Sequence, residues 1–427
     1  MEIKDINPWW KTGRIDKEYA SLPRRALFNE IMPYVSERQA IAINGLRRMG
    51  KTVLMHHLIE FILKKHPPEN ILYFSFDLLD GRIEDILRSY TELTGADMRK
   101  EDIFIFLDEV QKHTGWENEL KVLYDNFRSV KFFISGSSSL FIEKKTKESM
   151  GGRVFSFTLN PLTFEEYLEL RKIRIGSNLS LFEDDLREAL VRYLRTGGFP
   201  ELLDMKEERK IDRYIKELIV DRVVYMDIPK VFEIEEPELL ARILSVISAE
   251  PGMVIDYGRL ASDLGRNRKT ITNYMFYLEK AFLVKKLYNY SRNMLTGERK
   301  MKKVYPTSTA FAFLFEAAEG KIMETAGLMN YDFRFFSRKD GKETDFIATG
   351  NGNKEILPIE LKYAKRVGKK DIRGLLHFIG KHGLERGLVI TKDNESQEKI
   401  NGMTIEYIPM WKWLLEAGRS KKTIPKV

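Results

Sequence analysis

The chain has 427 residues, of which 43% are hydrophobic and 31% are charged, so it can form about three domains of ordinary size. It contains no cysteine, which excludes disulfides and thiolate metal sites. No apolar stretch reaches the ~18 residues needed to cross a bilayer, and no signal peptide is recognisable at the amino terminus. We therefore expect a cytoplasmic protein without a membrane partner. The 71 basic and 63 acidic residues give a formal net charge of +8, which suggests contact with a polyanion only where basic residues cluster.

A phosphate-binding loop is the first motif of the chain. Residues 45–52 match the pattern G-x-x-x-x-G-K-T, after an apolar run at 40–43 and before a helical pattern at 53–59. This succession of strand, loop and helix favours a nucleotide site over a chance glycine turn. The predicted nucleotide-binding residues are Gly45, Leu46, Arg47, Arg48, Met49, Gly50, Lys51, Thr52 and Val53.

The loop predicts ATP as the ligand and Mg²⁺ as its cofactor. Gly45 and Gly50 let the backbone turn so that successive N–H groups face an anion, and the helix amino terminus adds the positive end of its dipole. Lys51 is expected to reach the β- and γ-phosphates, and the Thr52 hydroxyl is expected to bind Mg²⁺.

A second motif ends another buried strand. Residues 103–107 form a continuous apolar run suited to a parallel strand, and Asp108 and Glu109 follow it. Carboxylates at the carboxyl end of a strand lie in the crevice where open α/β sheets bind ligands. Asp108 is predicted to hold Mg²⁺, and Glu109 is predicted to orient or deprotonate the attacking water. The alternative is a strand that merely ends in charged residues.

A third apolar strand, at residues 130–134, ends in small hydroxyl residues. The segment 135–139 reads Ser-Gly-Ser-Ser-Ser. Ser135 directly ends the strand and is the best candidate to contact the γ-phosphate or the attacking water, as the polar sensor residue of AAA-type ATPases does. The alternative is a Ser/Gly turn that caps a helix.

Four segments together resemble a known family. They begin at Gly45, Leu107, Ile134 and Gly152, and the last reads Gly-Arg-Val-Phe-Ser-Phe-Thr-Leu-Asn-Pro-Leu-Thr-Phe-Glu-Glu-Tyr. They look like the prokaryotic AAA-type ATPases that carry a nuclease-like carboxyl-terminal domain of unknown function. The resemblance covers most of the chain and is strongest in residues 40–170. It implies an ASCE-type P-loop core, a helical lid, a winged helix and a terminal domain related to restriction endonucleases.

The resemblance also singles out Arg153. A Gly-Arg segment after the sensor strand is a hallmark of the family, which makes Arg153 a candidate for stabilising the charge of the transition state. The alternative is a structural ion pair, for example with Glu165 or Glu166. The competing arginines are Arg47, Arg48 and Arg222. Whether such an arginine acts in its own subunit or across an interface stays open.

Residues 236–304 predict a winged helix-turn-helix. Helical patterns cover 237–249, 256–264 and 267–280, and two short strands at 283–288 and 302–305 flank a basic loop. The basic residues of the region are Arg266, Arg268, Lys269, Lys285, Lys286, Arg292, Arg299, Lys300, Lys302 and Lys303.

The third of these helices is the predicted contact with DNA. Arg268, Lys269, Thr270 and Asn273 lie near its amino-terminal end, where a recognition helix meets the major groove. The alternative is a protein-interaction module or a lid, since winged helices also serve these purposes in ATPases.

The last part of the chain carries a second chemical pattern. Strands are predicted at 343–348 and 356–362, and Asp345 on one with Glu360 and Lys362 on the other match the D-x(n)-E-x-K pattern of restriction-type nucleases. Positions i and i+2 share a face of a strand. Asp345 and Glu360 are therefore predicted to bind Mg²⁺, while Lys362 assists the nucleophilic water or neutralises phosphate. Glu324, on a helical stretch at 320–328, could add a carboxylate. The alternative is that Glu360 and Lys362 form an ordinary ion pair.

The sequence thus predicts an α/β protein with four parts. They are an amino-terminal extension, with Trp9 and Trp10 packed on a parallel-sheet P-loop core (1–160), a helical lid (161–235), the winged helix (236–304) and an α/β nuclease-like domain (305–427). The predicted function is Mg²⁺-dependent ATP hydrolysis that couples nucleotide state to a DNA or protein partner, in a monomer or an oligomer. Two alternatives remain: an ATP-gated, metal-dependent DNA nuclease, and a nucleotide-switched signalling or antitoxin-like regulator without a role for DNA.

Overall fold

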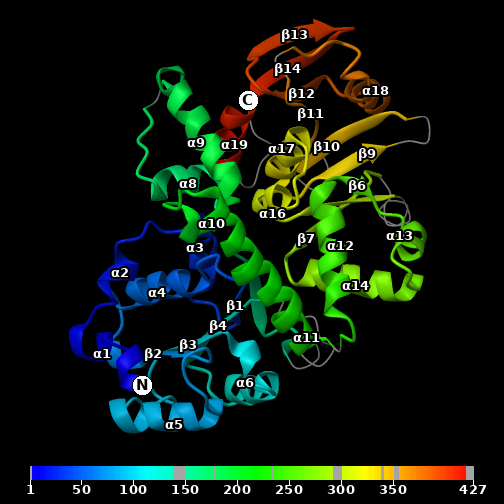
Figure 1. Ribbon diagram of the computed structural model, residues 1–427. Coiled ribbons are helices and arrows are strands. Elements are labelled where there is room, and N and C mark those ends of the chain that lie inside the picture. The colour runs from blue at the N-terminus through cyan, green and yellow to red at the C-terminus, as the bar shows by residue number, and fades with distance from the viewer. Residues whose placement is uncertain are drawn as a thin grey trace. The chain divides into compact units, whose positions relative to one another are not determined.

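The computed structural model describes residues 2–137, 150–176, 178–232, 234–291, 301–337, 341–350, 355–364 and 366–419. The chain divides into two compact units, residues 1–160 and residues 161–427 (Figure 1). We describe each unit by itself. Within the described ranges, no helix combines the length and the apolar character that a bilayer crossing requires.

The first unit is built on a parallel sheet. Its order is β2-β3-β4-β1-β5, and each neighbouring pair is parallel. The strands are β1 (Ala40–Asn44), β2 (Ile71–Ser75), β3 (Ile103–Asp108), β4 (Val130–Gly136) and β5 (Val154–Thr158). Every residue of β1 to β4 is buried, as expected for parallel strands covered by helices on both faces. The apolar runs predicted at 40–43, 103–107 and 130–134 are therefore strands.

Helices cover both faces of this sheet (Figure 1). The helices of this unit are α1 (Trp9–Thr12), α2 (Lys17–Ala20), α3 (Ala26–Ile31), α4 (Lys51–Ile62), α5 (Ile83–Thr94) and α6 (Trp116–Asn126). Helices α5 and α6 pack on one face through an apolar cluster that includes Leu72, Ile105, Leu107, Tyr90 and Trp116. Helix α4 covers the opposite face. Because the sheet is rigidly enclosed, the residues that follow its strands are held in fixed positions.

The amino-terminal segment closes the free edge of strand β2. The Asn7 side chain imitates a neighbouring strand: its Nδ2 donates to the Tyr73 carbonyl at 2.9 Å, and its Oδ1 accepts from the Tyr73 N–H at 2.7 Å. The indole N–H groups of Trp9 and Trp10 both donate to the Ile71 carbonyl, at 3.0 and 2.8 Å. These bonds use backbone groups that an edge strand would otherwise expose. The predicted packing of both tryptophans on the core is confirmed.

The second unit begins with a helical region. Its helices are α8 (Phe164–Leu170), α9 (Glu183–Thr196), α10 (Glu208–Arg213) and α11 (Ile228–Val231). Thr163 and Glu166 form a capping box at the start of α8, with each side chain accepting from the backbone N–H of the other. Helix α9 ends at Gly197, whose φ of +61° and close approach to Ser308 leave no room for a Cβ.

The next region combines helices with a small sheet. It contains α12 (Pro237–Ala249), β6 (Met253–Val254), α13 (Tyr257–Asp263), α14 (Arg268–Lys280), β7 (Val284–Tyr288) and β8 (Lys302–Pro306). The three strands pair antiparallel in the order β6-β8-β7. The helices and the two longer strands lie where the sequence predicts them. The two-residue strand β6 is too short to show an alternating pattern, so the sequence does not reveal it.

The carboxyl-terminal region is a mixed six-stranded sheet with helices. Its order is β13-β14-β12-β11-β10-β9, in which β11, β12 and β14 are parallel and the other pairs antiparallel. The strands are β9 (Arg334–Ser337), β10 (Glu343–Gly350), β11 (Glu355–Lys362), β12 (Arg386–Thr391), β13 (Ser396–Ile400) and β14 (Met403–Pro409). The helices are α16 (Thr309–Leu314), α17 (Glu319–Leu328), α18 (Arg373–His382) and α19 (Met410–Arg419).

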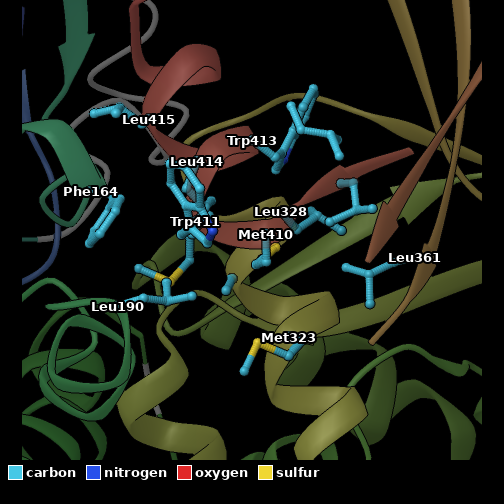
Figure 2. Packing of buried hydrophobic residues seen from close by; sticks show 14 of the residues in the cluster. Phe164, Leu190, Met323, Leu328, Leu361, Met410, Trp411, Trp413, Leu414 and Leu415 are labelled. Carbon is cyan, nitrogen blue, oxygen red and sulfur yellow. The ribbon is translucent and has the colours of Figure 1, made fainter. Parts of the chain in front are cut away.

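One hydrophobic core joins the start and the end of the second unit. Phe164 of α8 and Leu190 of α9 belong to the same cluster as Met323 of α17, Leu361 of β11 and Trp413 of α19. Figure 2 shows these side chains gathered between the helices and the sheet. Residues 161–235, predicted as a lid, thus share a core with the region predicted as nuclease-like.

Candidate functional site

The predicted phosphate loop connects β1 to α4 in the first unit. Gly45 has a φ of +148°, and a Cβ there would lie 2.4 Å from the Leu159 carbonyl oxygen. Arg48 and Gly50 are left-handed, with φ of +64° and +90°. A loop with such alternating conformations, leading into a helix amino terminus, is the backbone arrangement that binds phosphate. The glycines of the motif are thus required by the shape of the loop.

Lys51 brings a positive charge to this loop. Its side chain is 4% exposed. The ammonium donates to the carbonyl oxygens of Gly45 at 3.2 Å and Leu46 at 3.4 Å, and it lies 3.5 Å from Glu109 Oε1. Lys51 therefore bends back over the loop and connects it to the carboxylate that follows β3.

Asp108 is the centre of a hydroxyl network at the carboxyl end of β3. Its Oδ2 accepts from the Thr52 hydroxyl at 2.6 Å and from the Tyr73 hydroxyl at 2.8 Å, and its Oδ1 accepts from the Ser135 hydroxyl. Burial and the neighbouring charge of Glu109 raise the pKa of Asp108, while the three hydroxyls oppose that rise. Thr52 and Asp108 together offer two hard oxygen atoms in direct contact, a donor set that suits Mg²⁺.

Glu109 is held in one position by its neighbours. Its backbone is left-handed, with a φ of +52°, and its N–H donates to the Ser135 hydroxyl oxygen at 3.0 Å. Its Oε2 accepts from the Gln111 side-chain amide at 2.5 Å. Burial alone would raise the pKa of Glu109, but Lys51 and Gln111 outweigh burial, so the pKa is lowered. Glu109 is therefore an ionised, oriented carboxylate at neutral pH.

Ser135 lies between the two carboxylate residues. It is fully buried, and its hydroxyl both donates to Asp108 and accepts from the Glu109 N–H. The hydroxyl proton is thus engaged by Asp108, and Ser135 holds the carboxyl end of β3 in place. A contact of Ser135 with the γ-phosphate or the attacking water stays a prediction. Ser137 accepts from Gln111 at 3.1 Å. Ser138 and Ser139 of the predicted segment lie outside the described residues.

Arg153 lies near the amino-terminal ends of the strands, whereas the phosphate loop follows a carboxyl-terminal end. It immediately precedes β5, whose first residue pairs with Ala40 at the start of β1, whereas the phosphate loop follows Asn44 at the end of β1. At ~3.3 Å per residue the two ends of β1 are ~13 Å apart, which is too far for Arg153 to reach the loop of its own chain. Its guanidinium forms a two-point ion pair with Asp125, at 3.0 Å to each oxygen. This geometry favours the structural ion pair within one chain, and the catalytic role of Arg153 stays a prediction.

Among the competing arginines, Arg47 is part of the loop, and its charge contributes to lowering the pKa of Glu109. Arg48 is the left-handed residue of the same loop. Arg222 belongs to the second unit. Arg47 is thus an arginine of the loop whose charge acts on Glu109.

Sequence reasoning missed three residues of this site. Tyr73 reaches Asp108 from β2, and Gln111 holds Glu109. Arg25 is 6% exposed and donates to the carbonyls of Met49 in the loop and of Asn160, both at 2.8 Å. A polar-tipped tyrosine inside an otherwise apolar strand was the available signal for Tyr73. Nothing in the local sequence marks Arg25, because its partners are far away along the chain.

The carboxyl-terminal pattern also comes together in space. Phe346 pairs with Ile359 in the antiparallel β10–β11 ladder, so Asp345 is opposite Glu360. The Lys362 ammonium lies 2.7 Å from Glu360 Oε1 and 3.8 Å from Asp345 Oδ2. The structure thus brings together the three residues of the D-x(n)-E-x-K pattern.

Glu324 of α17 is close to the same group. Burial and then the charge of Asp345 raise the pKa of Glu324. Its carboxylate accepts from the Tyr305 hydroxyl at 3.3 Å and from Lys321 at 3.0 Å. All four residues predicted for a nuclease site therefore lie in one region of the second unit.

The charges of this region favour the ion-pair alternative. Lys362 pairs with Glu360 and Asp345. These are the two carboxylates that the nuclease prediction assigns to a metal ion. Across the described part of the chain, no group of three or more His, Asp or Glu side chains could hold a metal. Burial and then the charge of Asp345 raise the pKa of Glu360, whereas Lys362 lowers it, so Lys362 is the neighbour that favours the ionised carboxylate. Metal-dependent cleavage stays a prediction that this arrangement does not favour.

Helix α14 presents the residues predicted to contact DNA. Asn267 caps the helix by accepting from the Thr270 N–H at 2.8 Å. Arg268, Lys269 and Asn273 are exposed, and Thr270 is half-buried. Within the described ranges, Arg268 and Lys269 form no ion pair. Two unpaired cations thus stand at the amino-terminal end of this helix.

Several of the remaining basic residues of the region are paired with carboxylates. Lys285 pairs with Asp332 at 2.7 Å, Lys286 with Glu279 at 2.9 Å, Arg266 with Glu236 at 2.7 Å, and Lys303 with Glu343. Arg292, Arg299 and Lys300 lie outside the described residues. Much of the predicted charge is therefore neutralised inside the second unit, and the exposed basic surface is smaller than the sequence suggests.

Three family models match successive parts of the chain. Residues 37–168 match an AAA domain. Residues 187–313 and 319–413 match two domains of unknown function, DUF8612 and DUF4143. The chain thus carries an AAA-type P-loop domain over the parallel sheet, followed by two regions whose families have no assigned function.

Over most of its length the chain is similar to relatives that are named uncharacterized proteins. Two proteins of Methanocaldococcus jannaschii are each 27% identical; one match covers 94% of this chain and 90% of the relative, the other 87% of each. Among solved structures, the ORC1 protein of Aeropyrum pernix in complex with DNA is 16% identical, with a TM-score of 0.28, over 72% of this chain and 95% of that one. That likeness is too loose to carry an argument.

Proposed function

We propose that this protein binds ATP and hydrolyses it with Mg²⁺. The observation that carries the proposal is the single network that joins the phosphate loop to both carboxylates: Thr52 bonds Asp108 at 2.6 Å, and Lys51 pairs with Glu109 at 3.5 Å. A glycine turn or a charged strand end of ordinary kind would not bring both carboxylates into contact with residues of the loop.

Each residue of the network has a distinct task in this proposal. The loop N–H groups and Lys51 bind the phosphates, which removes Lys51 from its carbonyl partners. Thr52 and Asp108 hold Mg²⁺, which supplies neutralising charge to the phosphates when bound. Glu109 orients the attacking water and accepts its proton, and Gln111 and Ser135 keep Glu109 in place.

Equilibrium titration of the full chain with ATP tests the binding half of the proposal. We expect one ATP per chain, with tighter binding in Mg²⁺ than in excess EDTA because Thr52 and Asp108 contribute only through the metal. Equal affinity in the two conditions would remove Mg²⁺ from the site.

Tyr73→Phe tests whether the Asp108 network positions the metal ligands. The Tyr73 hydroxyl donates to the same Asp108 oxygen that contacts Thr52, and a hydrogen bond to a charged group is worth about 1.5–3 kcal/mol. We expect about a tenfold increase in the Mg²⁺ concentration that gives half-maximal ATPase activity. Tyr90→Phe is the matched control, since Tyr90 is also buried and its hydroxyl donates to the Glu69 carbonyl. Equal Mg²⁺ dependence in the two variants would exclude this role of Tyr73.

We further propose that nucleotide state is coupled to a partner bound by the second unit, and that residues 236–304 act as a winged helix. Arg268 and Lys269 support DNA as the partner, because they are exposed and unpaired within the described ranges at the start of α14. A protein partner and a regulator without DNA are the alternatives. An ATP-gated nuclease is less well supported, because Lys362 pairs with Glu360 and Asp345.

Reversing both charges, in Arg268→Glu with Lys269→Glu, tests the choice of DNA. We expect weaker duplex binding and a log–log salt dependence that is shallower by about 1.8, since each lost phosphate contact removes about 0.9 from the slope. Lys369→Glu with Lys370→Glu is the matched control, because these lysines are also adjacent and exposed. Filter binding over a range of salt concentrations measures both. The same slope in the two double variants would favour a protein partner.

A further inference from the structure

A cavity lies in the first unit, away from the network of Thr52, Asp108, Lys51 and Glu109. It has a volume of about 520 Å³ and is lined by residues that precede strands, among them Arg38, Asp102 and Ser129, and by Lys65 and His66 just beyond α4. These residues lie at the amino-terminal ends of the strands of the parallel sheet. The phosphate loop follows the carboxyl-terminal end of β1, so the cavity lies at the opposite ends of the strands from the loop.

The cavity is rich in cations that lack carboxylate partners. Arg38, Lys65, Arg128 and Lys131 line it, and none of them forms an ion pair within the described ranges. Two carboxylates, Glu37 and Asp102, also line it. Positive charge therefore exceeds negative charge, and a concave surface of this kind concentrates anions.

Lys131 is one of these cations, and the fold buries it. It is 7% exposed, and its ammonium donates to the carbonyls of Tyr34, Glu37 and Gln39 at 2.8, 2.5 and 2.5 Å. Burial lowers its pKa to about 8. The charge of Glu37 opposes that decrease only in part, so an anion that enters beside this buried cation would stabilise it.

The other wall of the cavity is apolar. Phe61, Ile62, Phe104 and Val130 line it. The Lys65 ammonium lies 5.2 Å from the Phe61 ring centre, and the His66 ring stands edge-on to Phe104 at 4.5 Å. A ligand that fits must therefore offer both a negative group and an apolar or aromatic body.

We propose that this cavity binds a small organic anion with an apolar body, at a site distinct from the ATP site. Its volume lies within the ~300–1,000 Å³ typical of small-molecule sites, which combine an apolar lining with a few charged groups. The cations that contact the anionic group are Lys65 and Arg128. All three donors of Lys131 already have partners, and Arg38 is held by the Tyr124 carbonyl and ring. The proposal does not depend on ATP hydrolysis.

Two dyes that differ only in charge test the proposal on the full-length protein. Anilinonaphthalene sulfonate carries a negative group on an aromatic body, and phenylnaphthylamine has the body without the charge. We expect saturable binding of one sulfonate dye per chain, at least tenfold tighter than the uncharged dye, and no displacement by ADP with Mg²⁺. Lys65→Glu with Arg128→Glu should weaken the sulfonate dye by about tenfold or more and leave the uncharged dye unchanged.

The control reverses two lysines outside the cavity, Lys17→Glu with Lys64→Glu, which are exposed on the same unit. It should keep the affinity of the wild type. The proposal is overturned if both double variants lose the sulfonate dye equally, if the two dyes bind alike, or if ADP with Mg²⁺ displaces the sulfonate dye. Melting curves of both variants distinguish loss of the site from loss of the fold.

Discussion

Glu109→Gln is expected to bind ATP as the wild type does and to hydrolyse it on the order of 10²–10⁴ times more slowly, the usual contribution of a general base. Glutamine has the same shape as glutamate, so the backbone bond to Ser135 survives. It cannot accept a proton, however, and it no longer carries the charge that Lys51 and Gln111 stabilise. Titration with a fluorescent ATP analogue and phosphate release measure the two effects separately.

Glu92→Gln is the control for this variant, because Glu92 is an exposed carboxylate on α5 of the same unit. It should behave as the wild type in both measurements. Hydrolysis by Glu109→Gln at the wild-type rate would show that another group activates the water.

Lys51→Ala is expected to weaken ATP binding by about a hundredfold or more, which corresponds to ~2.7 kcal/mol. The lost ammonium is the charge that we propose to contact the phosphates. The variant also leaves Glu109 buried without its nearest cation, and removing one partner of a buried pair commonly costs about 3–5 kcal/mol of stability. We therefore expect a lower melting temperature even without nucleotide.

The double variant Lys51→Ala with Glu109→Gln separates these two effects. It removes the uncompensated carboxylate, so it should recover much of the lost melting temperature without recovering ATP binding. Calorimetric melting and ATP titration of the wild type, both single variants and the double variant measure this. If the double variant melts as low as Lys51→Ala, the 3.5 Å contact between Lys51 and Glu109 contributes little to stability.

The sequence predicts the nucleotide network well because its residues follow strands and loops of distinct pattern. Apolar runs at 40–43 and 103–107 become parallel strands, and their carboxyl ends necessarily meet at one edge of the sheet. The pairing of Asp345 with Glu360 is predictable for a similar reason, since a hairpin fixes which residues lie opposite each other. Local pattern and short-range topology are sufficient in both cases.

Other features depend on contacts that sequence patterns do not encode. Tyr73 and Arg25 enter the site through partners far along the chain. Arg153 was singled out by family resemblance, and only the pairing of β5 with β1 reveals that it lies at the opposite ends of the strands from the loop. In the sequence, the basic residues of 266–303 form a cluster of positive charge. In the structure, ion pairs such as that of Lys286 with Glu279 neutralise part of it. Charge counts therefore overstate the exposed charge.

Phosphate release from ATP by the purified full-length chain, in Mg²⁺ and in excess EDTA, tests the central claim most directly. The wild type is expected to release phosphate steadily in Mg²⁺ and to stop in EDTA, because Thr52 and Asp108 act through the metal. Absence of release in Mg²⁺, or release at the same rate in EDTA, would contradict the assignment of this network as a Mg²⁺-dependent ATPase.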